Sequence, residues 1–241
     1  MSDRTMTVDT ADGPMEIYES APDQGGARAK GGVIVVQEAF GVNEHIESVA
    51  DRLAERGYHA VAPHFFHRAG GGTVPYGNFE KVIEKYQGLS DEGILVDVDA
   101  ARAVLHDAGW ADKSIGIVGF CFGGRVSFLV AAERSIGAAV GYYGGGIVNA
   151  RFPQFPALID EAKTLQTPWL GFFGDEDASI PVDDVEQLRA ALKDAPVDAE
   201  IVRYSDCGHG FNRDVSPDDY RPGPAADAWR RMLAWFDQHM E

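Results

Sequence analysis

The turn Gly119-Phe120-Cys121-Phe122-Gly123-Gly124 lies between a β-branched run and an apolar helical stretch, and it limits the folds open to this chain. A strand that passes directly into a helix needs very small residues on both sides of the turn, because the two backbones come close together. Gly119 and Gly123 stand two residues before and two residues after Cys121, which is the spacing of a nucleophile elbow. The pattern predicts that Cys121 is presented at the end of a strand. The alternative is an ordinary strand–helix turn that carries a small buried cysteine.

Strand and helix patterns alternate along most of the 241 residues. We expect a hairpin from 6–8 and 15–18, a loop at Gly25-Gly26 and an irregular loop over 64–80. Consecutive β-α-β units make their strands parallel, so the alternation predicts one α/β domain over 1–241, a mostly parallel sheet flanked by helices on both faces. The expected strands are 32–36, 58–62, 114–119, 137–142, 168–174 and 199–204, and the expected helices are 43–56, 90–105, 123–132, 183–192 and 224–239.

An acid and a histidine follow the cysteine, each directly after an expected strand. Gly174-Asp175-Glu176-Asp177 ends one strand, and His209 lies between two glycines after the next. A nucleophile needs a base, the base needs an orienting acid, and the chain order in α/β-hydrolases is nucleophile, acid, histidine. The order therefore predicts an α/β-hydrolase fold with a catalytic triad. The residues alone leave open which of the three carboxylates is the acid.

Two further groups also follow expected strands and should lie at the same edge of the sheet as the predicted triad. The backbone N–H of Phe122 opens the helix after the elbow, where it can donate to an oxyanion. Glu38 follows the buried run 32–36 directly, so its carboxylate is expected in the active-site region. The alternative for Glu38 is a solvated charge at the entry of the next helix.

These residues resemble the dienelactone hydrolase family, from about residue 31 to the C-terminus. The combination of a cysteine elbow with a Gln-Glu-x-Phe-Gly string is specific to that family among α/β-hydrolases. The strings that carry the resemblance are Gln37-Glu38-Ala39-Phe40-Gly41-Val42-Asn43, Gly119-Phe120-Cys121-Phe122-Gly123-Gly124, Gly141-Tyr142-Tyr143-Gly144, Gly174-Asp175-Glu176-Asp177 and Gly208-His209-Gly210-Phe211-Asn212-Arg213.

The resemblance implies a role for several individual residues. It implies that Asp177 is the triad acid and that Ala39 supplies a second oxyanion N–H. It implies that Glu38 rests against the Cys121 thiol and takes the thiol proton when substrate binds. It also implies that Arg213 holds a carboxylate of the substrate.

The chain departs from the family pattern at two places. The family has a second carboxylate-binding arginine in the segment that corresponds to roughly 72–90, where this chain has Lys81 and Lys85 but no arginine. His64 stands where an aspartate is common. Either lysine is a candidate substitute, although it offers a point charge instead of a planar fork. Tyr142 and Tyr143, at a strand end, line the pocket or pack in the core.

Charge and composition exclude several classes of function. Lys and Arg number 21 and Asp and Glu number 38, so the net charge is −17, which disfavours nucleic acid and anionic membranes as partners. No run approaches the about 20 apolar residues of a membrane span, and the polar segment 1–19 does not look like a signal peptide, so we expect a cytoplasmic protein. Neither a phosphate-binding glycine loop nor a metal-ligand spacing is found, and we expect no cofactor or metal. The histidines considered for a metal were His45, His59, His64 and His67.

The sequence thus predicts a hydrolase of carboxylic esters or lactones that uses Cys121 as its nucleophile. The expected partner is a small-molecule substrate, and the expected state is a monomer or a small homo-oligomer. One alternative is an acyltransferase or thioesterase with the same triad. A second is a non-catalytic member of the fold that binds ligands or senses redox state through Cys121. Cys207, the other cysteine, is expected to be inert packing.

Overall fold

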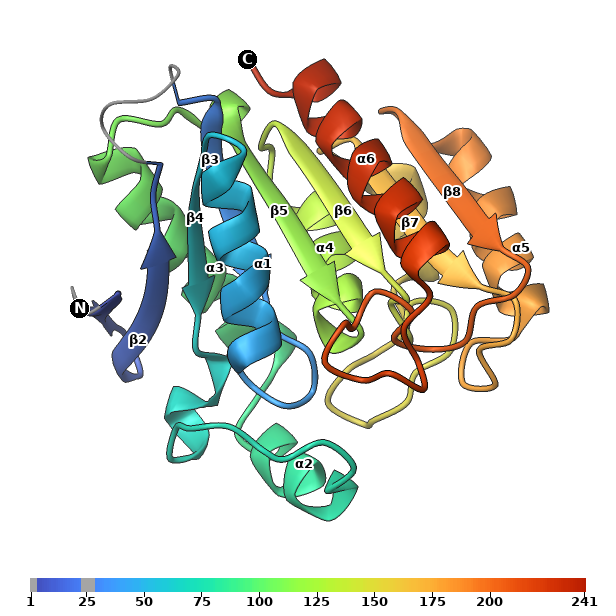
Figure 1. The fold of residues 1–241 in the computed structure, drawn as a ribbon, viewed down its shortest axis with the longest axis horizontal. Coiled ribbons are helices and arrows are strands. Elements are labelled where there is room, and N and C mark those ends of the chain that lie inside the picture. Colours follow the sequence, from blue (N-terminus) through green and yellow to red (C-terminus); the bar gives the residue numbers. More distant parts are fainter. Residues whose placement is uncertain (1–3, 23–28) are drawn as a thin grey trace.

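An eight-stranded sheet forms the centre of the molecule, within residues 4–22 and 29–241, which the computed structural model describes (Figure 1). The loop predicted at Gly25-Gly26 lies outside the described residues. The strand order across the sheet is β1-β2-β4-β3-β5-β6-β7-β8. The strands are β1 (Thr5–Thr10), β2 (Gly13–Ser20), β3 (Gly31–Val36), β4 (Tyr58–Pro63), β5 (Ile115–Phe120), β6 (Ala138–Tyr142), β7 (Trp169–Gly174) and β8 (Ala199–Tyr204).

The sheet is mostly parallel, as predicted. The hairpin of β1 and β2 pairs Met6 with Ile17, and β2 runs antiparallel to β4. From β4 across to β8, every neighbouring pair is parallel. All residues of β3, β4, β5 and β7 are buried, which is why these strands appear in the sequence as continuous apolar runs.

Helices cover both faces of this sheet. In Figure 1, α1 and α6 lie on the near face, and α3, α4 and α5 lie behind the strands. Helix α4 is buried from Phe122 to Ala132, so it is apolar on all sides instead of amphipathic. The helices are α1 (Glu44–Glu55), α2 (Phe79–Tyr86), α3 (Asp91–Asp107), α4 (Phe122–Glu133), α5 (Val182–Ala191) and α6 (Pro222–His239), with short 3-10 turns η1 (Phe65–Ala69), η2 (Asp112–Ser114), η3 (Ile159–Thr164) and η4 (Leu192–Asp194).

The segment between β4 and α3 is more ordered than predicted. A continuous irregular loop over 64–80 is wrong, because η1 lies within it and α2 begins at Phe79. The side chain of Asn78 caps α2 by accepting a hydrogen bond from the Lys81 N–H at 3.2 Å. Only Val82 and Tyr86 of α2 are buried. With eight residues and two core contacts, the helix gives too weak a periodic signal for sequence analysis.

The carboxyl ends of the parallel strands meet at one edge of the sheet, the lower edge in Figure 1. Glu38 lies just beyond β3, Cys121 just beyond β5 and Tyr143 just beyond β6. Asp177 and His209 follow β7 and β8. Helix α2 lies beyond the same edge. The fold therefore gathers the predicted site residues where open α/β sheets place their ligands. Among the described helices, none has the length and apolar character needed to cross a membrane.

Candidate active site

Cys121 occupies a strained turn between β5 and α4. Its φ is 53° and its ψ is −112°, a conformation that a residue with a side chain rarely adopts. A Cβ on Gly119 would lie 1.9 Å from the carbonyl oxygen of Gly123, and one on Gly123 would lie 2.5 Å from that of Val36. Both positions therefore require glycine, as the elbow pattern predicts. The side chain of Cys121 is partly exposed.

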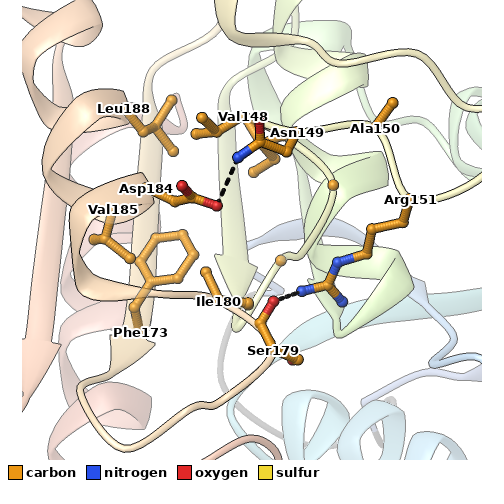
Figure 2. Close-up of a pocket in the computed structure, with 13 residues that line it drawn as sticks. Val148, Asn149, Ala150, Arg151, Phe173, Ser179, Ile180, Asp184, Val185 and Leu188 are labelled. Atoms are coloured by element: carbon orange, nitrogen blue, oxygen red, sulfur yellow. Dashed lines mark hydrogen bonds between the residues drawn. The ribbon is translucent and has the colours of Figure 1, made fainter.

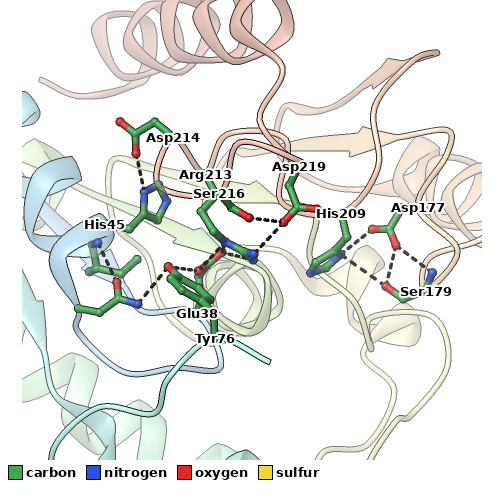
Figure 3. A network of polar contacts seen from close by, with 12 residues as sticks. Glu38, His45, Tyr76, Asp177, Ser179, His209, Arg213, Asp214, Ser216 and Asp219 are labelled. Atoms are coloured by element: carbon green, nitrogen blue, oxygen red, sulfur yellow. Dashed lines mark hydrogen bonds and ion pairs between the residues drawn. The ribbon is translucent and has the colours of Figure 1, made fainter. Parts of the chain in front are cut away.

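His209 and Asp177 form a close pair across the strand ends. The Nδ1 atom of His209 lies 2.6 Å from Oδ2 of Asp177 (Figure 3). The other oxygen, Oδ1, accepts from the backbone N–H of Ser179 at 2.9 Å and from its hydroxyl at 2.6 Å. Asp175 instead pairs with Arg203, at 2.6 and 2.8 Å, and Glu176 is exposed. The geometry thus selects Asp177 among the three carboxylates.

The electrostatics of this pair favour a charged imidazole. Burial lowers the pKa of His209, but the Cys121 charge and the Asp177 hydrogen bond outweigh burial and raise it to about 10. Burial raises the pKa of Asp177, but the hydrogen bond and charge of His209 and the hydrogen bonds from Ser179 together outweigh burial, so the net shift is downward. A protonated His209 beside the sulfur stabilises a thiolate, the nucleophilic form of cysteine.

Glu38 is fully buried and bound by two side chains from other segments. Its oxygens accept from Nε and Nη2 of Arg213 at 3.2 and 3.0 Å, and from the hydroxyl of Tyr76 at 3.1 Å. Arg213 also contacts Asp219 at 3.2 Å (Figure 3). Burial lowers the pKa of Arg213, but the charge of Glu38, its hydrogen bonds and the nearby tyrosines together outweigh burial, and the net shift is upward. The resemblance implied a Glu38 that rests against the thiol, whereas here the carboxylate is turned to Arg213.

A small cavity of about 50 Å³ opens beside Cys121. Most of its wall is aromatic: the Tyr86 ring lies 4.8 Å from Phe122 and 5.6 Å from Phe155, measured between ring centroids. Within the described residues, the N–H groups of Phe122 and Ala39 have no acceptor in the fold. The cavity therefore offers an apolar surface next to the Cys121 sulfur, with one candidate oxyanion donor, Phe122, in its wall.

The sequence matches the model of the dienelactone hydrolase family over residues 15–240. The chain belongs to this family. A Yersinia pestis protein, provisionally named a carboxymethylenebutenolidase, is 42% identical over 217 residues, covering 86% of this chain and 78% of the relative. A Rhodococcus opacus carboxymethylenebutenolidase is 29% identical over 86% of this chain and 81% of its own length.

Solved structures agree with this membership. A Klebsiella pneumoniae protein, provisionally named a dienelactone hydrolase, is 36% identical with a TM-score of 0.87 and covers 97% of both chains. An α/β serine hydrolase homologue from Coxiella burnetii, 22% identical with a TM-score of 0.64 over 97% and 96% of the two chains, shares the fold. The α/β-hydrolase fold is thereby confirmed, and the protein is a hydrolase of the dienelactone hydrolase type.

The two lysines proposed as substitutes for the arginine of the dienelactone hydrolase family lie in different surroundings. The Nζ atom of Lys85 donates to the carbonyl oxygens of Ala69 and Gly71 at 2.7 and 2.6 Å, at the C-terminal end of η1. Lys81 is exposed on α2. Neither lines the cavity at Cys121. His64 is partly buried, and burial lowers its pKa.

The two strand-end tyrosines differ in position. Tyr142 stacks on Phe120 at 4.7 Å and its hydroxyl lies 3.9 Å from the sulfur of Met232, so it packs in the core. The Tyr143 ring lies 5.1 Å from that of His209, and its buried hydroxyl has no partner among the described residues. Cys207 is fully buried, and burial raises its pKa to about 11, which fits inert packing. Across 4–22 and 29–241, no three His, Cys, Asp or Glu side chains cluster as ligands for a metal.

Four residues around the candidate catalytic groups of this dienelactone hydrolase family member were not predicted from the sequence. Ser179 supports Asp177, and Tyr76 and Asp219 complete the surroundings of Glu38 and Arg213. Arg151 lines the cavity beside Cys121. For Ser179, its spacing of two residues from Asp177 was a usable signal, since short polar side chains often bond to nearby carboxylates in turns. The other three come from irregular segments whose course only the tertiary fold defines.

Proposed function

We propose that this protein hydrolyses carboxylic esters and lactones through an acyl-enzyme on Cys121. The observation that carries the proposal is the strained elbow, which holds a partly exposed sulfur beside the His209–Asp177 pair. Strain of this kind persists only where the surrounding structure enforces it, and it is concentrated at functional sites. A merely buried, inert cysteine would not need such strain.

The first half of the proposed reaction forms a thioester. The Cys121 thiolate attacks the carbonyl carbon, and the charge that develops on the carbonyl oxygen is held by the N–H groups of Phe122 and Ala39. The bond to the leaving oxygen then breaks, and that oxygen takes the proton of the charged His209, which leaves the imidazole neutral. We keep Glu38 as the first acceptor of the thiol proton. In the structure Glu38 lies against Arg213 and Tyr76, so it has to turn toward Cys121 to take that proton.

The second half releases the acid. His209, oriented by Asp177, takes a proton from water while the water oxygen attacks the thioester carbonyl. The thiolate leaves and the carboxylic acid departs. The relatives' name, carboxymethylenebutenolidase, denotes the opening of an unsaturated lactone that carries a carboxyl group. A dienelactone is therefore the first substrate to test.

The deciding experiment follows the loss of ultraviolet absorbance of a dienelactone. We expect turnover by the wild type and a fall in kcat/KM of at least about 10⁴-fold in Cys121→Ala. Cys207→Ala is the matched control, because it removes the other cysteine, whose side chain is buried and does not line the cavity at Cys121. In His209→Ala, mass spectrometry is expected to show an acyl group retained on Cys121. Turnover that survives in Cys121→Ala contradicts the mechanism.

The same assay separates the remaining alternatives. Addition of methanol during turnover yields a methyl ester if the enzyme passes its acyl group to acceptors other than water. Oxidation of Cys121 by peroxide, without turnover of any ester or lactone, assigns the protein to redox sensing.

A further inference from the structure

Most cations around the Cys121 cavity already have partners. Arg213 is neutralised by Glu38 and Asp219. Arg125 is 2% exposed and forms a two-pronged pair with Asp91, at 2.6 and 2.9 Å. A further carboxylate would find these guanidinium charges compensated. While Glu38 rests against Arg213, neither arginine is ready to bind an anionic group of a substrate.

Arg151 differs from these two arginines because its charge is not compensated by a carboxylate of the described residues. It is exposed on the segment that follows β6, and its Nη2 donates to the backbone carbonyl of Ser179 (Figure 2). Throughout 4–22 and 29–241, no carboxylate forms an ion pair with it. It therefore has an uncompensated charge and free N–H donors, in a protein with a net charge of −17.

The backbone holds the Arg151 guanidinium in place. A Cβ on Gly145 would lie 2.3 Å from Cζ and from Nη1 of Arg151, so the guanidinium occupies the space that any other residue at 145 would fill. One end of the guanidinium is bound to Ser179, which also supports the triad acid. The position of the charge is thus coupled to the catalytic groups.

Arg151 lines two adjoining cavities. One is the cavity of Cys121, with the aromatic side chains of Tyr86, Phe122, Phe152 and Phe155. The other, of about 230 Å³, is drawn in Figure 2 and has a wall that is partly apolar and partly polar, with Asp184 and Asn149 in it. Gly146 belongs to both as well. The free cation therefore stands at the boundary between the aromatic cavity at Cys121 and a larger cavity of mixed polarity.

We propose that Arg151 is the residue that binds the anionic group of the substrate, in place of the lysines on α2. The substrate class is then an ester or lactone with a planar unsaturated part, which packs against the aromatic wall, and a carboxylate, which the guanidinium holds by two parallel hydrogen bonds. This inference rests on the proposed function, since it assigns the specificity of the same site.

The kinetic test compares dienelactone with its methyl ester, which has the same reacting lactone but no charge. Arg151→Met is expected to lower kcat/KM for the anion by about 10- to 100-fold, mainly through KM, and to change that for the methyl ester less than about twofold. Arg151→Lys keeps the charge without the planar fork, and its kcat/KM for the anion is expected to lie between those of the wild type and Arg151→Met. Arg230→Met is the matched control, because it removes an exposed arginine on α6.

A second variant tests the position of the charge without removing it. In Gly145→Ala the new methyl group displaces the guanidinium, and the loss for dienelactone is expected to be smaller than in Arg151→Met but again selective for the anion. Equal losses for dienelactone and its methyl ester in both variants overturn the inference.

Binding separates this inference from the proposed function. Calorimetric titration with cis,cis-muconate, a planar unsaturated dicarboxylate, measures affinity without chemistry. We expect the wild type to bind it and Arg151→Met to bind it at least about tenfold more weakly. Absent or unchanged binding overturns the role of Arg151. If the wild type binds muconate but hydrolyses neither lactone, only the proposed function fails.

Discussion

At the residue scale, the site depends on charged side chains that are buried in pairs. Glu38 has no exposed surface, and Arg213 supplies it with a countercharge from the segment after β8. Removing water from both charges is costly, and their mutual attraction offsets that cost only while both are present. The pair consequently acts as a unit whose halves cannot be lost separately without a large penalty.

Removing the charge of only Arg213 or only Glu38 should therefore lower the free energy of unfolding far more than removing both charges. We expect Arg213→Met to lower the free energy of unfolding by about 3–5 kcal/mol, measured by urea denaturation, because it leaves a buried carboxylate uncompensated. Glu38→Gln in the same chain should restore most of that loss. Arg231→Met, which breaks an exposed pair with Asp227, should cost less than about 1 kcal/mol. Additive effects of the two buried substitutions contradict the coupling.

At the element scale, one residue joins the start of a helix to the site. Asn43 caps α1 by accepting a hydrogen bond from the Ile46 N–H at 3.3 Å. Its amide also lies 3.0 Å from the hydroxyl of Tyr76, which in turn donates to Glu38. The position of α1 and the orientation of Tyr76 are thus linked through a single side chain.

Substitutions at residue 43 should separate these two roles. Asn43→Ala is expected to cost about 1 kcal/mol of unfolding free energy, since a helix cap is lost, and also to lower kcat/KM through Tyr76. Asn43→Ser keeps a capping oxygen but is too short to reach Tyr76, so it should lower kcat/KM with little loss of stability. Urea denaturation and lactone turnover measure the two effects. A stable, fully active Asn43→Ala variant would show that the linkage has no consequence.

At the scale of the whole molecule, the net charge of −17 opposes the approach of an anionic substrate. The proposed attraction by Arg151 acts at short range, whereas the repulsion extends over a Debye length. That length falls from roughly 30 Å at 0.01 M salt to roughly 8 Å at 0.15 M. Salt should therefore weaken the repulsion along the approach more than the contact inside the cavity.

This balance predicts an unusual response to salt. For dienelactone, kcat/KM should rise several-fold when ionic strength increases from about 0.01 to about 0.15 M, because screening raises the rate of encounter. For the neutral methyl ester, it should stay nearly constant. Steady-state kinetics on the two compounds measure the difference. A fall for dienelactone would mean that local attraction, and not the overall field, controls its approach.

The α/β fold and the order of the site motifs could be predicted from the sequence, because their causes are local. Continuous apolar runs predict strands buried on both faces, and the confirmed parallel sheet has those strands. The glycines around Cys121 predict the elbow, since no other residue fits where two backbones meet. Glu38, Asp177 and His209 follow strands, and parallel strands bring their carboxyl ends together. Their catalytic roles stay predictions until activity is measured.

What only the tertiary structure decided is which side chains meet across those ends. The choice of Asp177 over Asp175 depends on where Arg203 lies, and the partner of Glu38 comes from 175 residues further along the chain. The engagement of Lys85 by backbone carbonyls and the free charge of Arg151 likewise result from the paths of irregular segments. Sequence periodicity predicts which face of each segment is buried, but it does not predict which distant segment packs against that face. The hydrogen-bond partner of a side chain and the compensation of its charge depend on which distant segment lies against it, so they are defined only in the folded chain.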